Sequence, residues 1–487
     1  MNLWNHKCIY YFAFTCLLFG SCSSSHDEDI DPTQPDAGGS VAVSKFGLDR
    51  QSVLDHFSKS LKGQSDTFEV SAPLASEEVA GACEYVWDLW RTAVKRSGGE
   101  RLPELKSHYK LESWDMIQTP DAIWKVPEGN MDIFYGSKGA RPSDGYPLFL
   151  FLHGSGADAN GEWTACLYHA ETFADGPSAY FLPKSPQGGT GTRWFQPSKQ
   201  EKWEQLLRQA LTHDNINPRK IYIAGISEGA YGSQRLASFY ADYLAGAGPI
   251  AGGEFLSNCP PENLANIAFT LQTGELDTSY GRDLLTRKVG SLLDEYAAAH
   301  PGYYVHKVEL QPGKGHGCDY SLSTPWLVSY TRNATPKYFY WENFGMGDIN
   351  DEPRRYRDTF YNLQILEPSD DRTDPTLRTA YEMNIAGNNV SLTVNNVALT
   401  TTEPVTPPTG TINIGVEKSF TPATKGRVRI FLNDDLVDLS QPVTVNVNGA
   451  ERFSGELKPA GETIVESCRL FYDPLRLFPA YVDVDIR

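Results

Sequence analysis

The sequence predicts an α/β fold with a mainly parallel sheet, preceded by a helical extension and followed by an antiparallel β-sandwich-like domain. Continuous apolar runs such as PLFLFL (147–152) and IYIAGI (221–226) are typical of strands buried on both faces. Helical patterns separate these runs, which indicates parallel strands joined by right-handed crossovers. Beyond about residue 336 the apolar side chains alternate with polar ones, as in RVRIFL (427–432) and VTVNV (443–447), which indicates antiparallel strands.

The first segment, 1–21, has the features of an export signal. Lys7 precedes an apolar run over 9–19, which is shorter than the about 20 residues that span a bilayer. The run ends in Gly-Ser-Cys, which resembles a lipobox, so we expect cleavage before Cys22 and lipidation of that residue. An ordinary cleaved signal with a chance cysteine is the alternative.

The segment 22–45 is expected to be a flexible tether. After Cys22 it contains the acidic run SSSHDEDID and then Pro32, Pro35, Gly38 and Gly39, a composition that cannot bury a core. The acidic run resembles the export signal of surface lipoproteins in Bacteroidetes; a solvated spacer is the alternative. We therefore expect an exported lipoprotein, surface-exposed at the outer membrane, with the periplasmic face as the alternative location. The lipid is expected to be its only membrane contact.

Charge and cysteine content exclude some functions. With 61 acidic and 43 basic side chains, the chain has a formal net charge of −18, which disfavours nucleic acid as a partner because phosphate binding needs a basic face. Five of the eight cysteines lie beyond Cys22, and they show no CxxC pair or Cys/His spacing typical of zinc. We expect no metal and no organic cofactor, and at most two disulfides within the chain.

Residues 46–110 are expected to form a helical region, because apolar side chains recur there at three- and four-residue spacing until Gly98-Gly99. We interpret this stripe as a packing surface rather than a ligand site. The region has no assigned function. The stripe consists of Val79, Cys83, Val86, Trp87, Trp90 and Val94.

The catalytic domain is expected over 111–335 and the β-sandwich-like domain over 336–487. Short apolar runs bounded by turn signals indicate strands, and longer segments with one apolar face indicate helices. Besides the two runs above, we expect strands at 131–135, 179–183, 267–272 and 303–309, and helices from Trp203 to Leu211, from about Ala230 to Leu244, and over 281–299.

The segment Gly-Ile-Ser-Glu-Gly (225–229) has the form GxSxG, with Ser227 as the candidate nucleophile. The pattern is weak in isolation, but here it follows an apolar strand and opens a helix, which is the context it requires. A nucleophile at such a sharp turn has a strained backbone, and side chains at the two flanking glycines would clash. A structural serine in a tight turn is the alternative.

A serine nucleophile needs a base, and the base needs an orienting acid. Three histidines follow Ser227, and we expect His300, near a helix end, and His306, within a strand, to be structural. His316 lies in the glycine-rich loop GKGHGC after the last predicted strand, which favours it as the base. For the acid we prefer Asp277, after the strand AFTLQ, over Glu275 two residues earlier.

The oxyanion hole requires two backbone N–H groups. One is expected from Glu228, directly after the nucleophile, and the other from the loop His-Gly-Ser-Gly (153–156), with Ser155 preferred over Gly154. His153 precedes the nucleophile in the chain, and we interpret it as a residue that shapes this loop.

Four stretches resemble α/β-hydrolase esterases related to polyhydroxybutyrate depolymerases, feruloyl esterases and acetyl esterases. The resemblance extends, with the tail FLNDDLVDLSQPVTVNVNG, to secreted or lipid-anchored bacterial hydrolases, and it covers about three-quarters of the chain. It implies the α/β-hydrolase fold and a Ser-His-Asp triad made of Ser227, His316 and Asp277. The four stretches are LHGSGADANGEW, GISEGAYGS, GELDTSYGR and GHGCDYSLSTPWL.

Loops at the carboxyl ends of parallel strands line the site in such sheets. We therefore expect Trp163 and Trp194 to contact substrate, because an indole stacks on a sugar or an aromatic acyl group; packing beneath the loops is the alternative. Tyr280 and Arg282 follow the candidate acid and are expected to line the cleft, with capping of the next helix as the alternative.

Together these features predict a serine carboxylesterase that cleaves acetyl or hydroxycinnamoyl esters of polysaccharides or oligosaccharides. An acylated glycan or another ester is the expected partner. A serine peptidase of the same fold is one alternative, although no propeller-like repeat precedes the catalytic motifs. A glycan-binding lipoprotein without activity is the other alternative.

Overall fold

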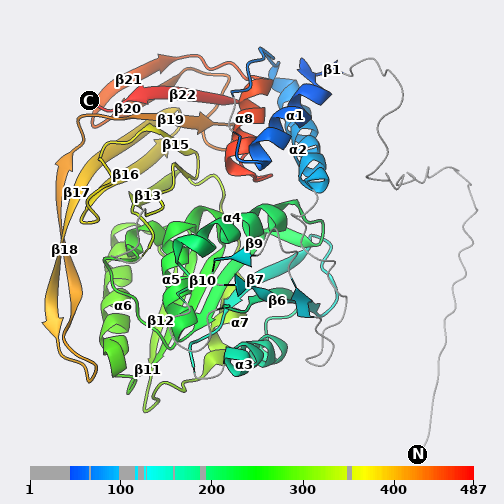
Figure 1. Ribbon diagram of the computed structural model, residues 1–487. Helices are drawn as coiled ribbons and strands as arrows, with labels where there is room; N and C mark the ends of the chain where they lie inside the picture. The colour runs from blue at the N-terminus through cyan, green and yellow to red at the C-terminus, as the bar shows by residue number, and fades with distance from the viewer. Residues whose placement is uncertain are drawn as a thin grey trace, which may run out of the picture. The chain divides into compact units, whose positions relative to one another are not determined.

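The computed structural model describes residues 44–64, 67–97, 116–118, 125–127, 129–156, 159–186, 193–347 and 354–487 (Figure 1). The predicted signal, Cys22 and nearly all of the tether lie outside the described residues, and these assignments stay predictions. Within these ranges, no helix combines the length and the apolar character needed to cross a membrane.

An eight-stranded sheet forms the centre of the α/β region, with the order β12-β11-β10-β9-β7-β8-β6-β3. The strands from β12 to β8 are parallel to their neighbours, and β6 and β3 are antiparallel at one edge. This topology confirms the predicted fold class. The strands are β3 (Met116–Gln118), β6 (Asp132–Lys138), β7 (Tyr146–Leu152), β8 (Ser178–Pro183), β9 (Ile216–Ile226), β10 (Gly246–Ile250), β11 (Ala268–Gly274) and β12 (His306–Gln311).

Helices cover both faces of this sheet, which explains why its strands are apolar on both sides. On β7, Leu148 and Leu150 pack with residues of α4 and α5, whereas Phe149 and Phe151 pack with residues of α3 and α7. The alternation of side chains along a strand sends neighbouring residues to opposite faces. The helices are α3 (Ala159–Thr172), α4 (Pro197–Thr212), α5 (Glu228–Phe239), α6 (Arg282–Ala299) and α7 (Ser323–Leu327).

Strand β10 has the sequence GAGPI and was not predicted, because glycine and proline are depleted in strands. It is fully buried between β9 and β11. A Cβ atom on Gly246 would lie 2.7 Å from the Ala268 carbonyl oxygen and 2.7 Å from Leu327 Cδ2. Glycine therefore permits the close approach of α7 to the sheet, which is a property of packing rather than of local preference.

The N-terminal helices α1 (Arg50–Leu61) and α2 (Val79–Arg96) pack against a helix of the C-terminal region, α8 (Gly461–Phe471). Val86, Trp90 and Val94 of the predicted stripe are buried in this contact, as its packing interpretation expects. Helix α8 interrupts a region predicted to contain strands. Its apolar residues Ile464, Val465, Cys468 and Phe471 follow helical spacing and are fully buried.

The C-terminal region contains two sheets, of six and four strands. Strand pairs are antiparallel as predicted, except that β17 and β20 are parallel. The first sheet has the order β13-β16-β17-β20-β21, with β18 also paired to β17, and the second has the order β14-β15-β19-β22. The strands are β13 (Tyr338–Asn343), β14 (Thr359–Phe360), β15 (Leu363–Glu367), β16 (Leu377–Ala386), β17 (Asn389–Val405), β18 (Ile412–Pro422), β19 (Arg427–Leu432), β20 (Val443–Val447), β21 (Ala450–Gly455) and β22 (Ala480–Asp485).

Two short ribbons complete the strands of the described residues. Each pairs two-residue strands in antiparallel fashion: β1 (Ser44–Lys45) with β2 (Leu48–Asp49), and β4 (Lys125–Val126) with β5 (Gly129–Asn130).

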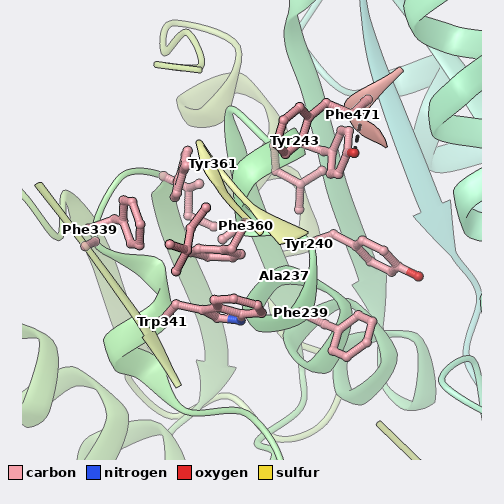
Figure 2. Packing of buried hydrophobic residues seen from close by; sticks show 14 of the residues in the cluster. Ala237, Phe239, Tyr240, Tyr243, Phe339, Trp341, Phe360, Tyr361 and Phe471 are labelled. Carbon is pink, nitrogen blue, oxygen red and sulfur yellow. Dashed lines mark hydrogen bonds between the residues drawn. The ribbon is translucent and has the colours of Figure 1, made fainter. Parts of the chain in front are cut away.

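The α/β region and the C-terminal region share one apolar core. Phe239 at the end of α5 packs edge-on against Phe344, with ring centroids 5.5 Å apart. Tyr243 donates a hydrogen bond to the Phe471 carbonyl, and Trp341 lies in the same cluster (Figure 2). The C-terminal region is therefore packed onto the α/β region through buried aromatic rings, and not merely linked to it by the chain.

Candidate active site

Ser227 lies at the turn between β9 and α5 with a positive φ of 57° and a ψ of −114°. A Cβ atom on Gly225 would lie 2.2 Å from the Gly229 carbonyl oxygen, and one on Gly229 would lie 2.1 Å from the Leu152 oxygen. Glycine is therefore required at both positions, and the strained serine presents its hydroxyl at the carboxyl end of the sheet.

The structure brings the three predicted triad residues together in one chain of hydrogen bonds. His316 Nε2 lies 3.0 Å from Ser227 Oγ, and His316 Nδ1 lies 2.7 Å from Asp277 Oδ2. Asp277 follows β11 and His316 follows β12, so both loops leave the same edge of the sheet as Ser227. This geometry permits the serine hydroxyl to pass its proton to the imidazole.

Asp277 is held by a second partner in addition to the imidazole. Its Oδ1 accepts a hydrogen bond of 3.0 Å from Arg282 Nη1, and Arg282 Nε donates to the Tyr231 hydroxyl at 3.0 Å. Burial opposes ionisation of Asp277, but the hydrogen bond from His316 and the charge of Arg282 outweigh it and lower the pKa of the carboxyl. The acid is therefore ionised at neutral pH.

The competing acid and bases have other contacts. Glu275 is exposed and accepts a hydrogen bond of 3.1 Å from the Gly313 N–H, which supports the loop leading to the base. His300 stacks on Tyr338 with ring centroids 4.8 Å apart. His306 lies in β12, where its Nε2 is 3.2 Å from a carboxylate of α6. The distances thus favour Asp277 and His316.

The two predicted oxyanion donors line the same cleft as the nucleophile. Glu228 is the first residue of α5, and the first N–H groups of a helix have no acceptor within it. Ser155 lies in the loop after β7 and lines the same cleft as Ser227. A Cβ atom on Gly154 would lie 3.2 Å from Ser227 Cβ, so this loop passes directly beside the nucleophile. The placement is compatible with the predicted donors, whose role stays a prediction.

A segment of this chain is 29% identical over 141 residues to the poly(3-hydroxyalkanoate) depolymerase C of Paucimonas lemoignei, covering 26% of this chain and 32% of that protein. Another match, 34% identical over 109 residues, is the bifunctional acetylxylan esterase/xylanase XynS20E of Neocallimastix patriciarum, covering 22% of this chain and 16% of that protein. The resemblance to the α/β-hydrolase esterases is confirmed. The chain spans about a third of the length of the first curated relative and about a sixth of the length of the second.

Solved structures similar to this chain include a thermostable esterase, with 21% identity and a TM-score of 0.36 over 46% of this chain and 64% of that chain. The ferulic acid esterase AmCE1/Fae1A of Anaeromyces mucronatus is 13% identical, with a TM-score of 0.32 over 47% of this chain and 94% of that chain. No family model matches the chain.

The structure buries both predicted substrate-binding tryptophans, which corrects that expectation. Trp163 is 4% exposed, stacks on Phe134 and donates a hydrogen bond of 2.9 Å to the Leu182 carbonyl. Trp194 is fully buried, and its Nε1 donates to the His153 carbonyl at 3.0 Å. Each indole N–H is satisfied by the backbone, so packing beneath the loops, the alternative interpretation, describes both residues.

His153 shapes the loop beside the nucleophile, as its position in the chain indicated. Its Nε2 accepts a hydrogen bond of 3.0 Å from the Ser185 N–H, so Nδ1 carries the proton and donates to the Gly154 carbonyl at 2.7 Å. Burial is the main cause that lowers the pKa of His153 from 6.5 to about 4. The folded chain therefore holds this imidazole neutral.

This neutral histidine makes the stability of the fold sensitive to acid. Because His153 in the unfolded chain binds a proton near pH 6.5, whereas folding delays protonation to about pH 4, stability is lost as the pH falls through this window. We expect the wild type to lose about 2 kcal/mol more unfolding free energy between pH 7 and pH 5 than His153→Gln loses. Urea unfolding at both pH values measures this difference, and equal losses would contradict it.

A cleft of about 510 Å³ opens beside Ser227. Tyr280 and Arg282 line it, in agreement with their predicted place. Tyr280 is 54% exposed, so its ring is accessible to a ligand. The lining residues are Ser155, Arg193, Phe195, Ser227, Glu228, Tyr231, Arg235, Gly253, Glu254, Phe255, Tyr280, Arg282 and Ile412.

Two carboxylates and their cationic partners make much of the cleft polar. Burial and the charge of Glu254 raise the pKa of Glu228, and Arg235 and Arg193 oppose this effect. Arg235 Nε lies 2.5 Å from Glu254 Oε2, and its guanidinium lies 3.5 Å from the Phe195 ring centroid. Paired charges of both signs beside aromatic rings suit a neutral ligand rich in hydroxyl groups better than an anion.

Several residues that line the cleft were not predicted from the sequence. Tyr231 and Arg235 follow Ser227 by four and eight positions on α5, so their helical spacing from the nucleophile was a usable signal. Ile412 comes from β18 of the C-terminal region, and no local pattern connects it with the nucleophile.

The cysteines carry no cross-link in the part of the chain that the structure describes. Cys83, Cys166, Cys259, Cys318 and Cys468 are free, and all but Cys83 are buried. Among the same residues, no cluster of histidine, cysteine or acidic side chains has the arrangement of a metal site.

Proposed function

We propose that this chain is a serine carboxylesterase that removes acetyl or hydroxycinnamoyl groups from polysaccharides or oligosaccharides. The observation that carries the proposal is the continuous hydrogen-bond chain from Ser227 through His316 to Asp277. It lies at a strained strand-to-helix turn and opens into a polar cleft. Such a chain activates a hydroxyl that is otherwise a weak nucleophile.

In the acylation step, Ser227 Oγ attacks the ester carbonyl carbon while its proton passes to His316 Nε2. Ionised Asp277 accepts the Nδ1–H hydrogen bond and stabilises the imidazolium. The N–H groups of Ser155 and Glu228 donate to the oxyanion. Collapse of the tetrahedral intermediate breaks the bond to the alcohol, which leaves with the proton from Nε2.

Deacylation repeats these steps with water as the nucleophile. His316 Nε2 takes a proton from the water as its oxygen attacks the acyl carbon, and the proton then returns to Ser227 Oγ as the acid leaves. The residues named above perform each proton transfer, and each step balances without a further reactant.

The chemistry of the cleft and the names of the relatives support a glycan ester as substrate. One relative is named a poly(3-hydroxyalkanoate) depolymerase and the other a bifunctional acetylxylan esterase/xylanase, and the second name denotes cleavage of a glycan ester. In this chain, Arg193 and Arg235 with Glu228 and Glu254 offer donors and acceptors for sugar hydroxyls. The aromatic rings of the cleft suit a sugar face or a planar acyl group.

A substrate screen tests the proposal. The purified chain is incubated with acetylated xylan, feruloylated arabinoxylan oligosaccharides and short peptide amides, and released acetate, ferulate and amines are quantified. We expect acid release from at least one glycan and none from the amides. Amide cleavage without ester cleavage would establish the peptidase alternative. Failure to hydrolyse any substrate, together with no labelling by a fluorophosphonate probe, would indicate an inactive binding protein.

A further inference from the structure

Strands β17 and β18 continue beyond the sheet to which they belong. The pairing of β17 with β16 ends at Ala398, whereas its pairing with β18 continues to Val405 opposite Ile412. We call the two-stranded projection over 399–418 the arm. In Figure 1 it is the long orange ribbon beside α6, and its tip lies far from the rest of the C-terminal strands.

The arm is anchored at its base and along its length. At the base, Lys418 Nζ lies 2.6 Å from a Glu262 carboxylate oxygen and 2.7 Å from Glu342 Oε2, in a nearly buried arrangement. Further along, Glu403 Oε1 lies 2.5 Å from Lys288 Nζ of α6. An isolated two-stranded ribbon is marginally stable in water, so these contacts are needed to hold the arm in place.

The tip of the arm docks on the loop that follows the candidate acid. Thr409 Oγ1 accepts a hydrogen bond of 3.1 Å from the Tyr280 N–H. A Cβ atom on Gly281 would lie 2.7 Å from Ile412 Cδ1 and 3.2 Å from Pro407 Cγ. Pro407 is buried although its neighbours in the tip are exposed. The tip thus packs on the backbone at Gly281, where a side chain would displace it.

This docking places part of the C-terminal region in the cleft. Ile412 lines the cleft together with Tyr280, whose backbone has a positive φ of 59° and whose ring stays 54% exposed. The Arg282 guanidinium lies 4.9 Å from the Tyr280 ring centroid and also holds the carboxylate of Asp277. An aliphatic and an aromatic side chain therefore form an apolar section of the wall beside the triad.

We propose that the arm is a substrate-recognition element, in which Ile412 and Tyr280 pack against a flat apolar face of the substrate near the scissile ester. Two groups have this chemistry: the ring of a hydroxycinnamoyl ester and the apolar face of a pyranose. Aromatic and aliphatic side chains favour such faces because contact removes apolar surface from water. The proposal rests on the esterase function proposed above and extends it to the C-terminal region.

Variants of the full chain test this role with three esters: 4-nitrophenyl acetate, methyl ferulate and an acetylated xylo-oligosaccharide. We expect Ile412→Ala to lower kcat/KM for methyl ferulate or the oligosaccharide about tenfold more than for 4-nitrophenyl acetate, mainly by raising KM. A selective loss with methyl ferulate identifies the aromatic acyl ring as the group bound. A selective loss with the oligosaccharide identifies the sugar face. Equal losses with all three esters would overturn the proposal.

Asn413→Ala is the matched control, because Asn413 is the exposed neighbour of Ile412 on the same strand and is expected to change no ratio. Thr409→Val removes the acceptor of the Tyr280 N–H and should raise KM for the same larger ester, whereas Thr409→Ser should restore it. If Ile412→Ala does not fold, the comparison of Thr409→Val with Thr409→Ser tests the arm's role in its place. Equal KM values of these two Thr409 variants for the larger ester would overturn that role. A wild type inactive on all three esters would overturn the esterase function and this proposal with it.

Discussion

Replacing Ser227 by alanine is expected to lower kcat for 4-nitrophenyl acetate roughly 10⁴- to 10⁶-fold. The hydroxyl removed is the atom 3.0 Å from His316 Nε2, and no acyl-enzyme forms without it. The residual rate is expected from the oxyanion donors and substrate binding. Steady-state hydrolysis measures the loss, and thermal unfolding monitors the fold. Alanine and serine both carry a Cβ atom, so the strain at this turn is retained.

Ser233→Ala provides a matched control for this loss. Ser233 lies on the same helix, α5, is fully buried, and donates its hydroxyl to the Ala230 carbonyl at 3.1 Å. Its removal is expected to leave kcat within about twofold, because general damage to α5 is limited to one local hydrogen bond. A Ser227→Ala protein that retains a tenth of the wild-type activity would exclude Ser227 as the nucleophile.

Replacing Asp242 by asparagine is expected to destabilise the protein by about 3–5 kcal/mol. Asp242 lies in a short helix after α5 and is fully buried. Its two carboxylate oxygens accept hydrogen bonds of 2.5 and 2.9 Å from Arg357 and one of 2.6 Å from Arg476, both from the C-terminal region. Asparagine preserves the volume but leaves two guanidinium groups buried without this countercharge. Urea unfolding at neutral pH measures the loss.

The control for charge removal is Asp294→Asn, because the Asp294 side chain is 81% exposed beside His306. A surface pair of this kind contributes at most about 1 kcal/mol.

The pH dependence of stability gives a second test of the Asp242 carboxylate. Burial opposes ionisation of Asp242, but the two arginines outweigh it and lower the pKa of the carboxyl. Its contribution is therefore complete above the unfolded pKa, about 3.9, and is lost as the pH falls through the lower folded value.

The difference in stability between wild type and Asp242→Asn should accordingly shrink in acid. A difference below 1 kcal/mol at neutral pH would show that the arginines find other partners when the carboxylate is absent. Asp473 is a candidate partner for Arg476, since it already contacts Arg476 at 2.7 Å and Arg332 at 2.8 Å. The double variant Asp242→Asn/Asp473→Asn would then reveal the coupling between the two carboxylates.

The placement of the predicted triad residues followed mainly from local patterns. Ser227 needs a strand, a sharp turn and a helix in immediate succession, and these signals lie within about a dozen residues. His316 and Asp277 follow predicted strands, and parallel strands bring their carboxyl ends to one edge. Distance decided between Asp277 and Glu275, which are two positions apart: the first contacts the imidazole, and the second supports the loop leading to it.

Other features depended on contacts between distant segments. The local sequence around Trp163 and Trp194 does not distinguish a side chain that faces substrate from one that faces the core. Tertiary packing decides between the two, because it supplies the backbone carbonyls that accept the indole N–H groups. Strand β10 is stable because its neighbours bury it on both sides, although its own residues disfavour a strand. Helix α8 is likewise buried by α1 and α2, about 400 positions earlier in the chain.

Hydrophobic period, turn residues and the spacing around Ser227 were sufficient for the fold class and for placing Ser227 at a strand-to-helix turn, because each of these signals acts between neighbours in the chain. The wall of the cleft was decided by tertiary structure. Ile412 reaches Gly281 because β17 and β18 continue past their sheet and dock across 131 positions of sequence. Such a contact results from packing and from charge pairs between regions, which leave no periodic trace in either segment.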